Sequence, residues 1–462
     1  MVFDKELGVS RPELVRRDES PHAPWMKTNL NRGQLSRWKA MDISFSTFGD
    51  RMRSGSGIFE LMANLGDALT KNPEMRMMGG GNPGHIPEIQ GIWRGRMQAL
   101  LDEGAEFDRM LANYDGPQGS PAFLEALADL LNRENGWDVK PSNLAITNGG
   151  QTAFFFLFNM LAGECAGGKK KRILLPLAPE YIGYANQGMG EDLFDTRRPK
   201  IEQIDEHTFK YRVDFENLDV GDDIAAICVS RPTNPSGNVL TDGEIEKLRA
   251  IANEKGIPLI IDNAYGTPFP NAIFQEVNPV WDEGIILTMS LSKLGLPGCR
   301  TGIVVAHEDV IHALSVMNAV VGLANNNVGQ ALVRPLIENG EIIRMSRDVI
   351  RPYYEERSKQ AIELVRESFD DSLPYGYHAS EGAFFLWLWF KDLPVTTQVL
   401  YERLKQHSVL VVPGEYFFFG LHDPDWAHRH ECIRMTFTQP EAVVREGIGV
   451  IADEVAKIYA GS

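Results

Sequence analysis

The stretch GIILTMSLSKLGLPGCR (residues 284–300) joins an apolar run to a loop with hydroxyl and basic side chains. Its first part, 284–290, is mostly apolar and short, which is typical of a strand that is buried on both faces. Similar runs occur at 173–179, 225–230, 258–263 and 302–307. Residues 242–256 lie between two of these runs and have helical spacing with a glycine stop. Strands that alternate with helices predict an α/β fold with a mostly parallel sheet.

The other segments of the chain differ from one another in composition and hydrophobic periodicity. A chain of 462 residues is also too long for one compact core. Residues 1–40 are polar and weakly periodic, so we expect an N-terminal extension, to which we assign no role. We expect residues 41–90 to join a small domain and residues 91–340 to form the large domain that holds the ligand. Residues 341–462 combine helical stretches with short apolar runs, which predicts the smaller α+β domain.

The charge balance argues against nucleic acid and membrane partners. The chain has 46 basic and 63 acidic residues, a net charge of -17, which repels phosphate backbones and anionic lipid. The basic run at 169–172 is interpreted as a solvated loop before a strand. The apolar stretches are shorter than the roughly 20 residues of a membrane span. Four scattered cysteines and an N-terminus without an apolar core predict free thiols and a cytoplasmic location.

Lys293 stands just after the run at 284–290, where we expect the carboxyl end of a strand. Burial disfavours the ammonium form, and an amine with a depressed pKa is suited to forming a Schiff base with a carbonyl. The hydroxyls of Ser290 and Ser292 and the cation of Arg300 fit a phosphate anchor beside it. Taken alone, the motif is equally compatible with a surface lysine on a short loop.

Polar residues follow two more of the apolar runs, at the edge where parallel sheets bind ligands. A buried Asp262 at this edge needs a cation as its partner, and the protonated ring nitrogen of a cofactor would be such a cation. Tyr265 could then reach the phenolic oxygen of the same ring. Asn234 lies on a turn fixed by prolines, from which its amide can donate to that oxygen. A turn or helix-capping aspartate and an ordinary turn asparagine remain the alternatives.

Glycine-rich segments suggest where backbone approaches a ligand. Gly149, Gly150 and Gln151 open an apolar helix, whose free amides and dipole attract phosphate. The stretch GGGNPG (79–84) matches a dinucleotide fingerprint literally, but its prolines and its poor preceding strand favour a loop near a substrate carboxylate.

A group of three histidines and a cysteine lacks the second ligand pair of a zinc site. We therefore expect no metal, and we place these histidines in a loop near the mouth of the substrate site. The residues are His422, His428, His430 and Cys432.

In this order along the chain, the motifs resemble those of the fold-type I aminotransferases. The resemblance covers about residues 42–460, and it implies a mostly parallel sheet of the seven-stranded type in the large domain. It rests on NYDGPQG (113–119), PLAPEYIGYA (176–185), SRPTNPSGN (230–238), IDNAYGTPFP (261–270), SLSKLGLPG (290–298) and EGAFFLWLWFKDLP (381–394).

The resemblance implies pyridoxal 5'-phosphate as the cofactor, with Lys293 holding it and then moving the proton from the substrate Cα to C4′. It implies that Asp262 pairs with the ring nitrogen and that Asn234 and Tyr265 bond the ring oxygen. The phosphate would be held by Ser290, Ser292 and Arg300, and by the backbone of Gly149, Gly150 and Gln151.

The resemblance also implies that Tyr181 stacks on the ring and that Tyr114 reaches the phosphate of a neighbouring subunit. The site would then be shared within a homodimer. The substrate carboxylate would be bound by the fork of Arg434, near the backbone of Gly81. On a strand, Arg434 shares a face with Cys432 and Thr436, which favours an inward guanidinium.

The sequence departs from relatives that use acidic substrates. Residues 301–333 contain no lysine or arginine, and VVGLANNNVGQ (320–330) is neutral. The interpretation is therefore amino-group exchange between neutral amino acids, such as valine and alanine, and 2-oxo acids, such as pyruvate and 3-methyl-2-oxobutanoate. A lyase, a decarboxylase or an aminotransferase with another substrate stays open, because the same residues support several outcomes. A DNA-binding regulator on this fold is disfavoured, because residues 1–40 are too short for a winged helix.

Overall fold

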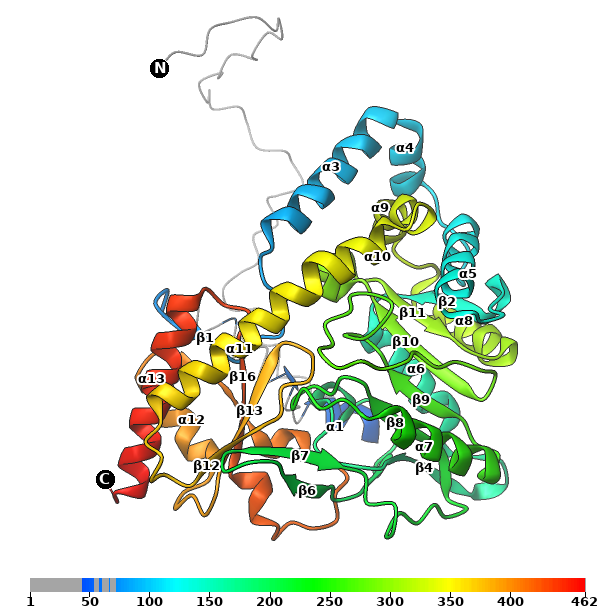
Figure 1. Cartoon of the computed structure of the whole chain (residues 1–462). Coiled ribbons are helices and arrows are strands. Elements are labelled where there is room, and N and C mark those ends of the chain that lie inside the picture. The colour runs from blue at the N-terminus through cyan, green and yellow to red at the C-terminus, as the bar shows by residue number, and fades with distance from the viewer. Residues whose placement is uncertain (1–43, 54–57, 60–65, 67–71, 462) are drawn as a thin grey trace, which may run out of the picture. The chain divides into compact units, whose positions relative to one another are not determined.

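The structure is a computed structural model that describes residues 44–53, 58–59, 66 and 72–461 (Figure 1). The expected extension at 1–40 lies outside the described residues. The chain falls into two compact units, Met1–Arg51 and Met52–Ser462. Helix α1 (Thr47–Arg53) begins in the first unit, and both large sheets belong to the second.

The larger sheet of the second unit has eight strands in the order β2-β11-β10-β9-β8-β4-β3, with β5 beside β4. The neighbours β10, β9, β8, β4 and β5 are parallel, which confirms the expected mostly parallel sheet. Every apolar run that predicted a strand in this region forms one. The strands are β2 (Leu144–Thr147), β3 (Gly163–Glu164), β4 (Lys170–Leu175), β5 (Phe194–Thr196), β8 (Ile224–Ser230), β9 (Leu259–Asp262), β10 (Ile285–Ser290) and β11 (Gly302–Val305).

Strand β11 runs antiparallel to both of its neighbours, β10 and β2. The segment that joins β10 to β11 holds two short 3₁₀ turns, Ser292–Leu294 and Pro297–Cys299, and no crossover helix. A parallel pair needs a crossover of a dozen or more residues, so this short connection reverses the chain. It also places Lys293 and Arg300 on the loop at the carboxyl end of β10.

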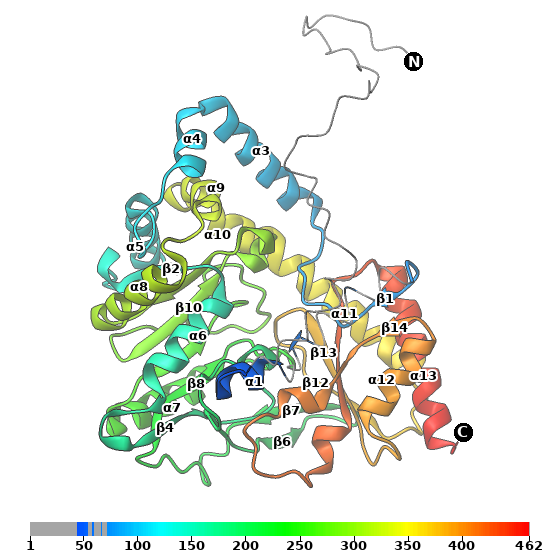
Figure 2. The same cartoon turned by 180° about the vertical axis from the view of Figure 1, so that it is seen from behind.

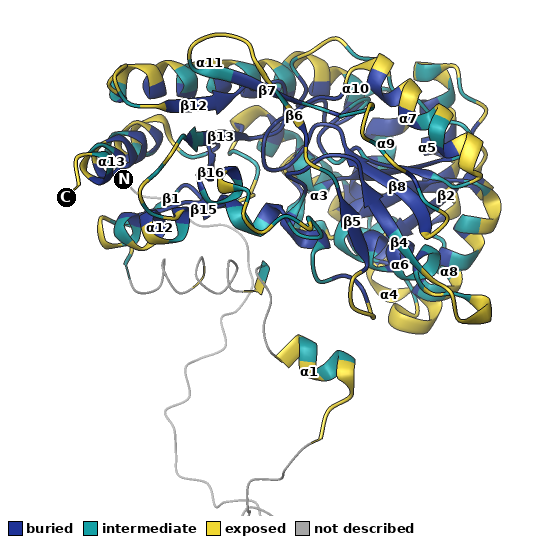
Figure 3. Cartoon of the chain, turned by 90° about the horizontal axis from the view of Figure 1, so that it is seen from below, coloured by how far each residue is buried: buried dark blue, intermediate teal, exposed yellow. Residues whose placement is uncertain are grey.

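Apolar side chains on both faces of this sheet are covered by helices. Ile260 belongs to the cluster with residues of α6 and α8, whereas its neighbours Leu259 and Ile261 belong to the cluster with residues of α5 and α7. Figure 3 shows the strands β4 and β8 as buried and the outer sides of the helices as exposed. The bounds are α5 (Pro121–Asn135), α6 (Gly150–Leu161), α7 (Asp242–Lys255) and α8 (Glu308–Gly322).

Helix α7 ends where the sequence signals predict. Thr241 and Glu244 form a reciprocal capping box at its start, and Gly256 stops it with φ 64°. The helical stretch that begins at Asn327 and ends at Ser368 is interrupted. Gly340, with φ 74°, separates α9 (Asn327–Glu338) from α10 (Glu341–Met345), and a π-helical turn (Ser346–Ile350) leads into α11 (Arg351–Ser368).

The second sheet has six strands in the order β15-β16-β13-β12-β7-β6. Strand β7 pairs in parallel with β12, so this sheet includes the β6–β7 hairpin, which comes from the middle of the chain. The division of the chain at residue 340 stays a prediction. The strands are β6 (Lys200–Gln203), β7 (Thr208–Arg212), β12 (Tyr375–His378), β13 (Phe385–Phe390), β15 (Val412–Pro413) and β16 (Cys432–Thr436).

Helices α11, α12 and α13 gather at the second sheet, and Figure 2 shows α12 and α13 from behind. A short parallel pair, β1 with β14, brings the loop at 79–84 toward β16. No helix among the described residues is long and apolar enough to cross a membrane. The remaining elements are α3 (Pro87–Glu103), α4 (Ala105–Ala112), α12 (Thr397–Gln406), α13 (Glu441–Tyr459), β1 (Arg76–Met77) and β14 (Val409–Leu410).

Candidate active site

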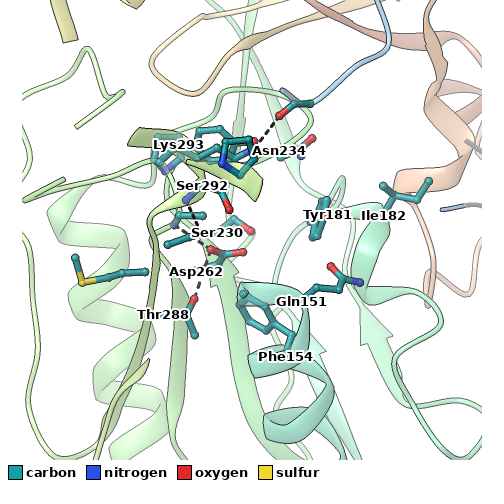
Figure 4. A pocket seen from close by; sticks show the side chains of 18 of the residues that line it. Gln151, Phe154, Tyr181, Ile182, Ser230, Asn234, Asp262, Thr288, Ser292 and Lys293 are labelled. Carbon is teal, nitrogen blue, oxygen red and sulfur yellow. Dashed lines mark hydrogen bonds between the residues drawn. The ribbon is translucent and has the colours of Figure 1, made fainter. Parts of the chain in front are cut away.

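A cavity of about 310 Å³ lies at the carboxyl ends of β8, β9 and β10, where a parallel sheet presents its ligand site. In Figure 4, Lys293, Ser292 and Asp262 face Tyr181 and Gln151 across this cavity. The structure therefore brings together side chains that are far apart in the sequence. The predicted residues that line the cavity are Gly81, Gly150, Gln151, Tyr181, Asn234, Asp262, Tyr265, Ser290, Ser292, Lys293, Arg300 and Arg434.

Lys293 extends from the 3₁₀ turn after β10 into the cavity. Its ammonium donates a hydrogen bond to the carbonyl oxygen of Gly81 at 2.8 Å and lies 4.9 Å from the centre of the Tyr265 ring. Desolvation, with the positive charge of Arg434 second, lowers the pKa of Lys293 to about 8, against the opposing effect of Asp262. A substantial fraction of this amine is therefore neutral, and nucleophilic, near neutral pH.

Asp262 ends β9 on the cavity floor. Its carboxylate accepts hydrogen bonds from the Tyr184 hydroxyl at 2.5 Å and from the backbone amide of Ala264 at 3.0 Å. Thr288 approaches the same group at 3.5 Å from β10. Burial raises the pKa of Asp262, and these hydrogen bonds oppose that rise. A cation placed against Asp262 would keep it ionised.

Arg434 enters the cavity from β16 with only 3% of its surface exposed. Its guanidinium donates to the side-chain oxygen of Asn234 and to the carbonyl oxygen of Gly79, both at 2.7 Å. The faces of Phe385 and Phe417 lie 4.2 and 5.3 Å from it. Among the described residues no carboxylate forms an ion pair with Arg434, and its Nε has no partner. A buried guanidinium without an acid is suited to the carboxylate of a ligand.

An anion cradle forms where α6 begins. Gly149 caps the helix with φ 91°, so the first amides of the helix point into the cavity without a side-chain cap. The guanidinium of Arg300 packs directly on Gly149, since a Cβ there would lie 2.1 Å from its Nη2. Ser290 and Ser292 line the cavity nearby, and the hydroxyl of Ser290 accepts from the amide of Ser292 at 3.1 Å. These groups match a phosphate.

The two predicted tyrosines Tyr181 and Tyr114 lie in different places. Tyr181 faces the cavity, and Gly183 permits this, because a Cβ on Gly183 would lie 2.3 Å from the Tyr181 ring. Tyr114 is 81% exposed and does not line the cavity. Its expected contact is with a second subunit and stays a prediction.

None of these histidines is among the described residues that line the cavity, and His428 lies in the core, which corrects the expectation for His428. His428 is buried, hydrogen-bonds the Tyr211 hydroxyl at 2.5 Å and lies 3.6 Å from the sulfur of Cys432. Burial lowers the pKa of His428 to about 3, so it is a neutral core residue. His430 pairs with Glu415 at 2.9 Å. Aromatic residues of the second sheet explain the position of His428, and the sequence spacing gave no sign of them.

Three residues around Asp262 escaped the sequence reasoning: Tyr184, Ser230 and Glu180. Tyr184 lies on the 3₁₀ turn Ile182–Tyr184, which folds back so that its hydroxyl meets Asp262, 78 residues further along the chain. Ser230 ends β8 beside Asp262, and Glu180 precedes Tyr181. An acid directly after the apolar stretch PLAP was the available signal for Glu180.

The fold and the cavity define an α/β enzyme with a lysine, an aspartate and an anion cradle around one ligand site. Residues 94–451 match the family model "Aminotransferase class I and II". The chain belongs to this family and is an aminotransferase. The expected α/β fold of the fold-type I aminotransferases is thereby confirmed.

Individual relatives share nearly the whole chain. The valine–pyruvate aminotransferase of Escherichia coli is 49% identical over 91% of this chain and all of that protein. The solved valine–pyruvate aminotransferase of Salmonella typhimurium has a TM-score of 0.81 and 47% identity over 88% of this chain and all of that one. A putative amino-acid aminotransferase from Psychrobacter arcticum has a TM-score of 0.88 and 45% identity over 91% of this chain and all of that one.

Proposed function

We propose that this chain is a pyridoxal-phosphate-dependent transaminase that exchanges amino groups between valine or alanine and 2-oxo acids such as pyruvate. The observation that carries the proposal is that Lys293, Asp262 and Arg434 line one cavity. These groups are a nucleophile, an anion for a ring cation and an anchor for a carboxylate.

The residues present fit the cofactor on structural grounds. The cradle of Gly149, Gly150 and Arg300 would hold its phosphate, and Asp262 would accept from its ring nitrogen. Because Arg434 occupies the oxygen of Asn234, the amide nitrogen of Asn234 is left to donate to the ring oxygen. When bound, the cofactor supplies an electron sink for the pair of electrons released at the substrate Cα.

The chain's own groups orient the substrate and move its proton. Arg434 holds the carboxylate, and three of its five N–H groups are left for this after the bonds to Asn234 and Gly79. The amine of Lys293, with its pKa near 8, would take the proton from Cα and return it to C4′ of the bound cofactor. Tyr181, which lines the same cavity, would stack on the ring of the cofactor.

Neutral substrates are supported by the charges of the cavity. Its basic lining residues are Lys293, Arg300 and Arg434, and each already has a role toward the cofactor or the α-carboxylate. Among the described lining residues no further cation remains for a second substrate carboxylate. The valine–pyruvate aminotransferases at 49% and 47% identity support the same substrates.

A half-reaction tests this function. The purified, cofactor-loaded enzyme is mixed with excess valine, and we expect one equivalent of 3-methyl-2-oxobutanoate and of pyridoxamine phosphate per site. Aspartate should react more slowly than valine by at least about tenfold, because its second carboxylate would be buried without a partner. Release of ammonia or carbon dioxide without pyridoxamine phosphate would instead identify a lyase or a decarboxylase.

Gly149→Ala tests the phosphate cradle, with Gly163→Ala as its matched control. The new Cβ at 149 would overlap the Arg300 guanidinium and sit at φ 91°, whereas a Cβ at 163 sits at φ 100° and meets nothing within 4 Å. We expect Gly149→Ala to weaken pyridoxal phosphate binding about 30-fold or more, equivalent to about 2 kcal/mol of backbone strain and lost contact. Gly163→Ala, which does not line the cavity, should bind within about threefold of wild type. Equal affinities of the two variants, measured by calorimetric titration, would disprove the cradle.

We further propose a cytoplasmic homodimer with shared sites. Four free cysteines support the location. Exposed apolar residues next to Tyr114 support the dimer, because Leu111 is also exposed. The carbonyl oxygen of Asn113 accepts a hydrogen bond from Asn327 at 2.9 Å, which fixes the chain at this surface. A second copy would cover this surface and bring its own Tyr114 to the cavity.

A further inference from the structure

Glu180 is a buried carboxylate that the mechanism above does not use. Its side chain is 1% exposed, and among the described residues no cation forms an ion pair with it. Instead it accepts hydrogen bonds from neutral groups of the chain: the Ser230 hydroxyl at 2.6 Å, the Ser230 amide at 2.9 Å and the Tyr181 amide at 3.1 Å. A buried acid that is bonded only to neutral groups can gain or lose a proton without breaking an ion pair.

Two hydroxyl groups connect Glu180 to Asp262. The Ser230 hydroxyl lies 3.4 Å from that of Tyr184, and the Tyr184 hydroxyl donates to Asp262 at 2.5 Å. Ser230 and Asp262 are register partners on β8 and β9, so the sheet itself fixes the spacing of this path. Two carboxyl groups therefore sit at opposite ends of a chain of two hydroxyls.

The direction of these hydrogen bonds depends on the proton of Glu180. When Glu180 is protonated, it can donate to Ser230, Ser230 to Tyr184, and Tyr184 to Asp262, so each donor reinforces the next. When Glu180 is ionised, Ser230 turns to it and the Tyr184 oxygen loses its donor. Asp262 then receives a weaker hydrogen bond beside a second negative charge, and it becomes a stronger acceptor for a cation.

The surroundings place this change near neutral pH. Burial, opposed by the bonds from Ser230 and Tyr181, raises the pKa of Glu180 to about 7, and the charge of Asp262 adds to the rise. The titratable groups facing Glu180 are Tyr184, Cys228 on β8 and Asp262 on β9, all acids. The backbone amide of Glu180 donates to the carbonyl oxygen of Phe417, on the turn Gly414–Phe417, at 2.9 Å.

We propose that Glu180 is a positioning residue that acts through the hydroxyls of Ser230 and Tyr184 on Asp262, so that its proton sets how strongly the site selects a cationic ring nitrogen. This inference rests on the proposed function. By linkage, ionising Glu180 strengthens binding of the ring nitrogen, and binding of the ring nitrogen favours ionised Glu180.

The test compares two ligands in three full-length proteins freed of cofactor. The ligands are pyridoxal phosphate and its analogue with a CH group in place of the ring nitrogen. The proteins are wild type, Glu180→Gln and the control Glu431→Gln. Glu431 is also a buried acid, 8% exposed, that accepts from the Trp389 indole at 2.8 Å and the Asp392 amide at 3.0 Å, and it does not line the cavity. Calorimetry gives the preference for the ring nitrogen as a ratio of dissociation constants.

At pH 6 the wild type and Glu180→Gln should agree within about twofold, because Glu180 is then neutral. At pH 8 the preference for the ligand with the ring nitrogen should be about tenfold larger in wild type than in Glu180→Gln. A tenfold difference is equivalent to about one pKa unit of coupling between Glu180 and the ring nitrogen. Glu431→Gln should follow wild type at both pH values. A ratio in Glu180→Gln that tracks wild type at both pH values overturns the proposal, and so does an equal loss of both ligands, which signals a structural role.

If Glu180→Gln does not fold, Ser230→Ala carries the test, since it leaves Glu180 in place and cuts the same path. The proposal is supported if the preference of Ser230→Ala for the ring nitrogen is the same at pH 6 and pH 8. It is overturned if that preference still rises with pH as it does in wild type. Wild type that binds neither ligand overturns the proposed function as well. A wild type that binds pyridoxal phosphate with no effect of Glu180→Gln overturns this inference alone.

Discussion

Lys293→Ala is expected to lower the transamination rate by at least about four orders of magnitude while the chain stays folded. General acid–base catalysis by one residue contributes about 10²- to 10⁴-fold, and this variant also loses the covalent attachment of the cofactor. The side chain makes one hydrogen bond, to Gly81, so its removal takes little from the fold. The measurements are single-turnover rates with valine and the midpoint of thermal unfolding.

A second buried lysine provides the contrasting control. Lys210 pairs with Glu381 and donates to the carbonyl oxygen of Val239 at 3.0 Å. It does not line the cavity and has no role in the proposed reaction. Lys210→Ala leaves Glu381 buried and unpaired, so it should lower the free energy of unfolding by about 3 to 5 kcal/mol. Its folded fraction should still turn over valine at close to the wild-type rate. Ordinary activity in Lys293→Ala would show that another residue carries the chemistry.

The strands of the large sheet, and the residues at their ends, were predictable from the sequence. Buried parallel strands appear as short apolar runs, and the carboxyl ends of such strands meet at one edge of the sheet. Asn234, Asp262 and Lys293 each follow such a run, so their meeting in one cavity needed no knowledge of side-chain contacts. Glycine signals likewise marked the end of α7 and the start of α6.

What escaped prediction depends on contacts between distant segments. The bonds of Tyr184 to Asp262 and of Ser230 to Glu180 arise only once a 3₁₀ turn folds back over two strands. The β6–β7 hairpin pairs with β12, more than 160 residues later, so its place in the second sheet has no local signal. The reversal of β11 followed from a missing crossover helix, which periodicity alone did not resolve.

Replacing Arg434 should separate recognition of the substrate carboxylate from the remaining chemistry. Arg434→Gln removes the charge and the fork, and we expect kcat/KM for valine to fall by about 10²- to 10³-fold, since truncating one partner of a buried charged pair costs about 2 to 5 kcal/mol. Arg434→Lys keeps a positive charge but lacks the planar guanidinium. Its kcat/KM for valine should lie between those of wild type and Arg434→Gln. Valinamide, which lacks the carboxylate, should lose far less, so the measured quantity is the valine-to-valinamide ratio.

The same substitution should also move a pKa, which a loss of folding would not do. The charge of Arg434 is the second cause, after burial, of the low pKa of Lys293. Without that charge the ammonium form is less disfavoured, so the pKa of Lys293 should rise above about 8. The pH profile of cofactor attachment to Arg434→Gln should therefore shift to higher pH, because Lys293 then loses its proton at a higher pH than in wild type. An unshifted profile with an unchanged valine-to-valinamide ratio would place the carboxylate anchor elsewhere in the cavity.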